Sequence, residues 1–282
     1  MNKNIWNELI TKFSTMPSKD FERKVNELSN KEIFYIEGDK TFDNRSVCLK
    51  GLFGSHNYNL NTENSDKDYK YFVVPNFDDL YDHNIYSHHF ISNDLDFTVH
   101  DIRKLPKLLW NGTPDFIELL YSCEIEGFDN LTNFLKENRK GLSALNFKAM
   151  YYCFRSRAND KSKAMLEDSP AKHNSIKEYG FDVKNACHSV RLYNFLERMA
   201  RYNMNVKKSL WYENGSERDL LLNIKLGHFT LEEVQDIIKK KEKTCLKLKE
   251  VFVEQRENGE LLSELEELVR KIIKEHFAEG NL

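Results

Sequence analysis

The hydrophobic pattern of this 282-residue chain changes once, from alternating strand-like segments to helical spacing. Three short segments rich in β-forming residues are found at 47–53, 69–74 and 95–100, and turn residues such as Gly54 and Pro75 bound them. From Asp101 onward, apolar residues recur at the spacing of helices, and no strand is expected beyond residue 130. The pattern therefore predicts an α+β protein, with a small mixed sheet and helices followed by an all-helical half.

The switch from strand-like to helical spacing divides the chain into three regions. We expect a helical N-terminal extension at 1–45, with a helix over 5–28, an α/β unit at 46–128 and a helical domain at 129–282 that binds acceptor or nucleotide. Helices are expected over 131–160, 181–204, 219–226 and 230–277, the last range being divided near Asn258. The polar stretch 160–178 is expected to be a loop.

Composition excludes several classes of protein. The net charge of −3 gives no global basic field, so a simple nucleic-acid-binding module is disfavoured, although a local basic groove is still compatible with it. The five cysteines form no CxxC pair, which argues against a disulfide framework or a structural zinc site. With no apolar run long enough for a signal peptide or a membrane span, we expect a cytoplasmic protein without membrane contact.

Two carboxylates near the second strand are candidates for binding divalent cations. Asp66 and Asp68 are two residues apart, so an extended backbone points both to one side and turns Lys67 and Tyr69 to the other. Carboxylates in this arrangement suit a pair of divalent cations, Mg²⁺ first and Mn²⁺ as an alternative, with substrate phosphates completing the coordination. A third carboxylate belongs on the polar face of the strand at 95–100. Asp94 and Asp96 share that face, and alternation does not choose between them.

Gly54 and Ser55 end the first strand, and ten residues separate Ser55 from Asp66. A glycine there allows close approach of a phosphate, and a following helix would add free N–H groups. Each fragment alone is common: Gly-Ser is mostly a turn, and Asp-x-Asp is mostly a solvated loop or part of a calcium site. An EF-hand is excluded because Tyr69 and its neighbours break the required loop pattern. The combination is what predicts phosphoryl transfer.

The motifs resemble a known family. Gly54 to Thr62 (GSHNYNLNT), Ser65 to Tyr69 (SDKDY) and Pro75 are similar to the polymerase β-like nucleotidyltransferases, in particular to predicted members associated with RNA ligases. Later segments agree over roughly 47–240, leaving the first 45 residues outside: LDFTV at 95–99, IRKL at 102–105, NGTPDFIELL at 111–120, DVKNACHSVRL at 182–192 and IKLG at 224–227.

The resemblance implies a site. In it, Asp66, Asp68 and Asp96 bind metal, and Gly54-Ser55 hold nucleotide phosphates; the preference for Asp96 over Asp94 rests on the resemblance alone. His56 departs from the small or basic residue expected after Gly-Ser, which leaves its role open.

The helical half offers further candidates. Lys184, His188 and Arg191 are spaced at i, i+4 and i+7, so they share one helix face, which suits a triphosphate or an RNA backbone. The alternative is an amphipathic helix with a merely solvated polar face. Glu118, an acid in an apolar helix, is interpreted as a salt-bridge anchor rather than a support for the site.

The sequence thus predicts a metal-dependent nucleotidyltransferase that moves a nucleoside monophosphate from an NTP to an acceptor hydroxyl and releases pyrophosphate. RNA is the favoured acceptor, with tRNA among the candidates. One alternative is nucleotidylation of a protein, and another is a non-catalytic protein that binds nucleotide or RNA. The sequence leaves open which NTP is used, whether addition is single or repeated, and the oligomeric state.

Overall fold

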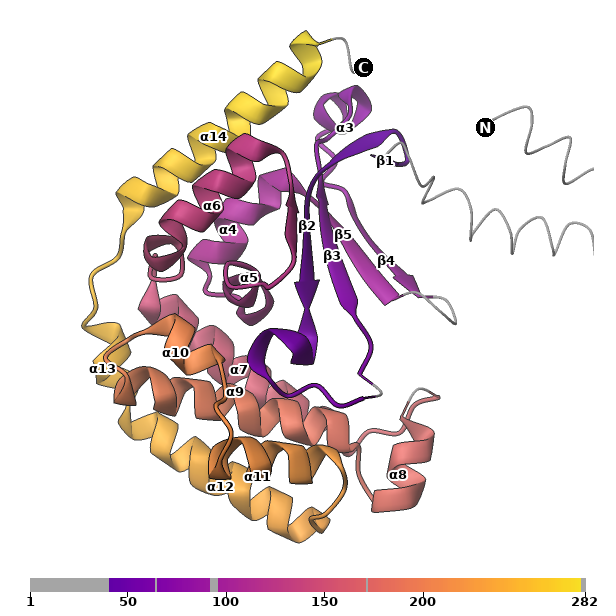
Figure 1. Cartoon of the computed structure of the whole chain (residues 1–282), viewed down its shortest axis with the longest axis vertical. Coiled ribbons are helices and arrows are strands. Elements are labelled where there is room, and N and C mark those ends of the chain that lie inside the picture. Colours follow the sequence, from indigo (N-terminus) through magenta and orange to yellow (C-terminus); the bar gives the residue numbers. More distant parts are fainter. Residues whose placement is uncertain (1–40, 64, 92–95, 171, 280–282) are drawn as a thin grey trace, which may run out of the picture.

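A computed structural model describes residues 41–63, 65–91, 96–170 and 172–279 of the chain, and at Asp96 it describes the backbone. The helix expected over 5–28 and the position of Asp94 lie outside the described residues. The described part contains one mixed sheet and many helices, which confirms the predicted α+β class (Figure 1).

The sheet has the strand order β1-β2-β3-β5-β4, with β6 paired to β2. β3 and β5 are parallel, and the other pairs are antiparallel. The strand bounds are β1 (Thr41–Phe42), β2 (Arg45–Phe53), β3 (Asp68–Val73), β4 (Ser87–Ile91), β5 (Asp96–Asp101) and β6 (Ile125–Gly127). The three strands predicted from sequence are confirmed as β2, β3 and β5. The other three were missed because they are short or, like β4 with its two histidines, lack apolar alternation.

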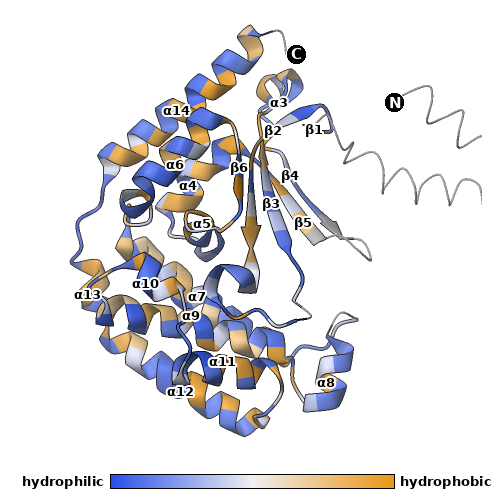
Figure 2. Ribbon diagram, in the orientation of Figure 1, coloured by the Kyte–Doolittle hydropathy of each residue, from blue (hydrophilic) through white to orange (hydrophobic). Residues whose placement is uncertain are grey.

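The two faces of the sheet are packed differently. On one face, Phe72 of β3 and Leu49 of β2 join the main core beneath the helices. On the other face, Tyr71, Val73 and Val99 form a small separate cluster with Phe42 and Phe97. Figure 2 shows that the end of β2 near Gly54 is mostly hydrophobic, as expected for a strand in the middle of the sheet.

The helices form two groups. α4, α5, α6 and α14 lie beside the sheet, and α7 and α9–α13 pack together below them (Figure 1). The helix bounds are α3 (Phe77–Tyr81), α4 (Leu105–Trp110), α5 (Pro114–Leu119), α6 (Asp129–Leu142), α7 (Phe147–Ala164), α8 (His173–Tyr179), α9 (Val183–Arg201), α10 (Val206–Leu210), α11 (Ser216–Lys225), α12 (Leu231–Lys247), α13 (Lys249–Val253) and α14 (Gly259–Ala278). Short 3-10 turns are η1 (Gly54–Tyr58) and η2 (Ile102–Lys104).

Two details of the helical prediction were wrong. The helix expected over 131–160 is two helices, α6 and α7, because Asn146 ends the connection between them as the N-cap of α7. The loop expected at 160–178 contains the end of α7 and all but the last residue of α8. That stretch is polar because α8 buries none of its residues, so it lacks the apolar periodicity by which a helix is recognised.

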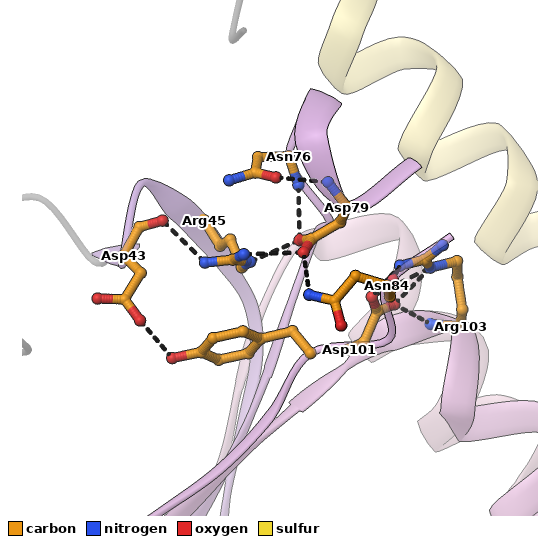
Figure 3. Close-up of polar contacts among 8 residues, drawn as sticks. Asp43, Arg45, Asn76, Asp79, Asn84, Asp101 and Arg103 are labelled. Atoms are coloured by element: carbon orange, nitrogen blue, oxygen red, sulfur yellow. Dashed lines mark hydrogen bonds and ion pairs between the residues drawn. The ribbon is translucent and has the colours of Figure 1, made fainter. Parts of the chain in front are cut away.

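A polar network fixes the end of the sheet remote from Gly54 (Figure 3). Arg45 of β2 donates to both carboxylate oxygens of buried Asp79, at 2.5 and 2.8 Å, and Asn84 donates to Asp79 at 2.8 Å. Asp101, at the end of β5, is fully buried and pairs with Arg103 at 2.5 Å. The network ties the start of β2 to α3 and to the end of β5.

Candidate active site

The proposed catalytic residues gather at the opposite end of the sheet. β2 ends at Phe53, just before Gly54, and antiparallel pairing sets Phe53 opposite Asp68. In the parallel pair, Tyr69 is the register partner of Phe97. The backbone of Asp96 therefore occupies the position beside Asp68 on the neighbouring strand, at the same edge as the Gly-Ser turn.

Asp66 and Asp68 line one cavity of about 270 Å³, together with Gly54, Ser55 and Ser65. Lys67 and Tyr69 instead bind a common partner, Glu124, at 2.5 and 2.6 Å. The separation of the two sets follows the alternation of an extended chain. No group of three metal-binding side chains occurs among the residues whose side chains are described, so the geometry defines a pair of carboxylates.

Gly54 lies directly over one of these carboxylates. Its φ of +83° is in the left-handed region, and a Cβ built on it would lie 3.1 Å from Oδ2 of Asp68. Glycine therefore serves two purposes here: it adopts this backbone conformation without strain, and it leaves the Asp68 carboxylate open on that side.

We expect Gly54→Ala to destabilise the fold by about 1 kcal/mol and to abolish activity. Gly180→Ala is the matched control, because Gly180 has φ of +81° but nothing within 4 Å of the added Cβ. Urea unfolding of the two variants should give similar losses of stability, while the nucleotide transfer predicted from the sequence should fail only in Gly54→Ala. Equal activity of the two variants would contradict this role of Gly54.

The segment after Gly54 differs from the helix expected there. It is η1, a 3-10 turn of five residues, so a helix dipole contributes little to phosphate binding at this point. His56, whose role was open, has Nε2 3.2 Å from the Ser65 carbonyl and so connects the Gly-Ser turn to the Ser65-Asp66 loop. Ser65 in turn accepts a hydrogen bond from the backbone N–H of Thr62 at 2.8 Å.

Residues of the helical half form hydrogen bonds with the loop that follows the Gly-Ser turn. Asn59 donates to the carbonyl of Tyr212 at 2.8 Å, and Arg218 donates to the carbonyl of Asn59 at 2.7 Å. Lys225 of α11 donates to the Leu60 carbonyl and to Ser65 Oγ, both at 3.1 Å. The Lys225 ammonium thus sits at the wall of the cavity that holds Asp66 and Asp68.

A second cavity of about 350 Å³ adjoins the first and shares Gly54, Asp68 and Lys184 with it. Residues of β3, β4 and β5 form one wall, while α5, α7 and α9 form the other. Cations from the helices line this second wall: Arg157, Lys161, Lys184 and Arg191. The same wall carries Asp115 and Glu118, which pair with Lys70 and Arg191, so cations outnumber acids on the helical side and face Asp66 and Asp68 at the sheet edge. This arrangement suits a polyphosphate held against carboxylate-bound cations.

The predicted face of α9 points into this cleft, but its three residues differ in character. Lys184 is exposed, and His188 is partly buried. Arg191 is buried, bonds Glu118 at 2.5 Å and stacks 4.1 Å from the Tyr58 ring centroid. The ion pair predicted for Glu118 is thereby confirmed, but its partner Arg191 lines the cleft, as Glu118 does, so the pair also supports the site.

His188 is a neutral group on this basic face. Burial, together with Arg191, Lys161 and Lys184, lowers the pKa of His188 from 6.5 to about 3. In the unfolded chain the imidazole takes up a proton below about pH 6.5, whereas the folded protein does not until about pH 3. The unfolded state binds more protons in this window, so this residue makes the fold less stable as the pH decreases.

We therefore expect His188→Gln to reduce the loss of stability between pH 7 and pH 5. Urea unfolding of the native protein and the variant at both pH values measures this difference. The same loss in both proteins would show that His188 does not have a lowered pKa.

Sequence reasoning overlooked three cations of the cleft. Lys225 is part of the IKLG segment, but nothing in its spacing pointed to the carboxylates more than 150 residues away. Arg157 and Lys161 are separated by four residues, and the i, i+4 spacing was a usable signal. It was missed because the helix was expected to end at residue 160.

A model of the RlaP family, the RNA repair pathway DNA polymerase beta family, matches residues 19–271. The chain belongs to this family. The match is longer at both ends than the resemblance over 47–240. The expectation that the first 45 residues fall outside the family was therefore wrong for 19–45, while 1–18 do lie outside the match. A comparison with curated proteins gave no match.

RlaP membership supports a nucleotidyltransferase-like role in an RNA repair pathway. It is consistent with the mixed sheet followed by helices. None of the described helices combines the length and the apolar character that crossing a membrane requires.

Proposed function

We propose that the protein transfers a nucleoside monophosphate from an NTP to an acceptor hydroxyl on RNA. The observation that carries the proposal is the composition of one cleft. Asp66 and Asp68 share a cavity with Gly54-Ser55, and Lys184 and Lys225 line the same cavity. Phosphoryl transfer needs little from a protein beyond positioning and charge neutralisation, which these residues are suited to provide.

The donor set fits Mg²⁺ or Mn²⁺. Asp66 and Asp68 would hold the metal, Asp96 is proposed as the third ligand, and the absence of a Cβ at Gly54 keeps the Asp68 carboxylate accessible. A metal bound there would neutralise charge on the phosphates and favour ionisation of the acceptor hydroxyl.

The side chains around this set bind and orient the substrates. Ser55, Lys184 and Lys225 would bind the β- and γ-phosphates. The acceptor oxygen forms a bond to the α-phosphorus, and the bond from the α-phosphorus to the bridging oxygen breaks. That oxygen keeps the electron pair and leaves as part of pyrophosphate. We propose that Asp96 receives the proton of the acceptor hydroxyl.

A labelling screen tests the proposal. Each of the four NTPs, labelled at the α-phosphate, is incubated with the protein, Mg²⁺ and either total RNA or total protein. We expect metal-dependent label in RNA and none with Asp96→Ala. Label in protein would favour nucleotidylation of a partner. NTP binding that is equally tight with and without Mg²⁺, and no transfer, would favour a non-catalytic binding protein.

A further inference from the structure

The larger cavity extends from Gly54 and Asp68 toward β5 and α7, and Ser55 is not among the residues that line it. Its sheet wall includes Lys70, Thr98 and His89, which are register neighbours across β3, β5 and β4. Its opposite wall includes Arg157 and Lys161 of α7. If the triphosphate occupies the cavity beside Gly54-Ser55, this second cavity is left for the other substrate.

Positive charge in this cavity is only partly compensated. Lys70 pairs with Asp115, and Arg191 pairs with Glu118. Arg157 and Lys161, in contrast, make no ion pair with any described residue, and they lie one turn apart on α7. Burial, Arg157, Lys172 and Lys184 lower the pKa of Lys161 although Asp115 opposes this, so a bound anion would stabilise the charged form of Lys161.

The remaining lining suits a nucleotide. Two aromatic residues, Phe53 and Tyr58, are among those that line the cavity. The Thr98 hydroxyl is buried and has no hydrogen-bond partner in the described part of the chain. A nucleic-acid end combines a phosphate, a sugar with hydroxyl groups and an aromatic base, and so matches all three features. A protein hydroxyl carries no phosphate and would leave Arg157 and Lys161 unpaired.

We propose that this cavity binds the 3′-terminal nucleotide of an RNA strand, with Arg157 and Lys161 on its phosphodiester. The terminal ribose hydroxyl then lies toward the carboxylate edge of the sheet, where the acceptor must react. This assignment rests on the proposed function, since it takes the neighbouring cavity as the NTP site.

The test measures RNA binding directly, without chemistry. A 5′-fluorescein-labelled, single-stranded oligoribonucleotide is titrated with the full chain at several salt concentrations, and anisotropy is recorded. Arg157→Gln and Lys161→Gln should each weaken binding about tenfold. Each should also reduce the slope of log K against log salt by about 0.7, the value for one phosphate contact on a single strand. Lys163 is an exposed lysine of α7 outside the cavity, so Lys163→Gln should leave the affinity for RNA and the salt slope unchanged.

A circular RNA of the same sequence tests the requirement for a strand end. It keeps the phosphates but has no 3′ terminus, so its binding should be weaker and insensitive to Arg157→Gln. The Kd for NTP, measured in parallel, should be the same in both cavity variants and the native protein.

Three outcomes would overturn the assignment. The first is that Arg157→Gln and Lys161→Gln weaken NTP binding and leave RNA binding unchanged. The second is that Arg157→Gln weakens the binding of linear and circular RNA equally. The third is that both variants bind RNA as the native protein does, and that the label is transferred to a protein. If RNA binding depends on Arg157 and Lys161 but no acceptor is labelled, the RNA site stands and the proposed catalytic function fails.

Discussion

Replacing Asp68 with asparagine is expected to reduce nucleotide transfer by about a thousandfold. The amide keeps the shape of the carboxylate but loses the charge that a divalent cation requires, at a cost of about 4 kcal/mol in the transition state. The rate of label incorporation at saturating NTP measures the loss. Asp66→Asn should reduce the rate in the same direction, because both residues line the same cavity.

Asp78→Asn is the matched control for this prediction. It makes the same chemical change on an exposed residue of α3, at the far end of the sheet. The control should transfer label at the native rate, and all three variants should unfold at the native Tm. Native transfer by Asp68→Asn would contradict the assignment of this carboxylate.

The largest effect on stability is expected from Arg191→Met. Arg191 and Glu118 are 6% and 4% exposed, and they lie in contact at 2.5 Å. Burial raises the pKa of the Glu118 carboxyl although Arg191 opposes this, so removing the arginine leaves a poorly solvated carboxylate in the core. Breaking such a pair typically costs about 3–5 kcal/mol, and urea unfolding measures it.

A double variant separates the two roles of Arg191. Glu118→Met combined with Arg191→Met removes both charges and fills the space with apolar atoms, so much of the lost stability should return. If NTP affinity stays low in the double variant, Arg191 also binds nucleotide. If NTP affinity returns together with stability, the arginine serves only as an anchor. Losses that simply add in the double variant would show that the two residues are not coupled.

Sequence reasoning succeeded where the signal was local. The alternation around Leu95, Phe97 and Val99 predicted β5, and the two-residue spacing predicted that Asp66 and Asp68 share one side. The pairing of Glu118 was also predicted, because an acid among apolar residues of a helix requires a partner.

The missing parts depend on contacts between distant residues. Nothing in a single sequence indicates that Lys225 reaches Ser65, or that α7 brings Arg157 to the sheet edge. β4 was missed because its pairing with β5, rather than its own apolar pattern, makes it a strand. Local periodicity therefore predicted Asp66, Asp68 and the face of α9, but not the cations that α7 and α11 bring to the cleft.

The hydrogen bonds between the helical half and the loop after Gly54-Ser55 affect how the chain folds. Tyr212, Arg218 and Lys225 hold Asn59 and Leu60 across more than 150 residues of sequence. On the ribosome, the loop can reach its final shape only after the segment through Lys225 has been made. Contacts of such separation close slowly, so the site should be completed in a late folding step, after the sheet has formed. A fragment that ends near residue 128 should therefore contain the motif without its working geometry.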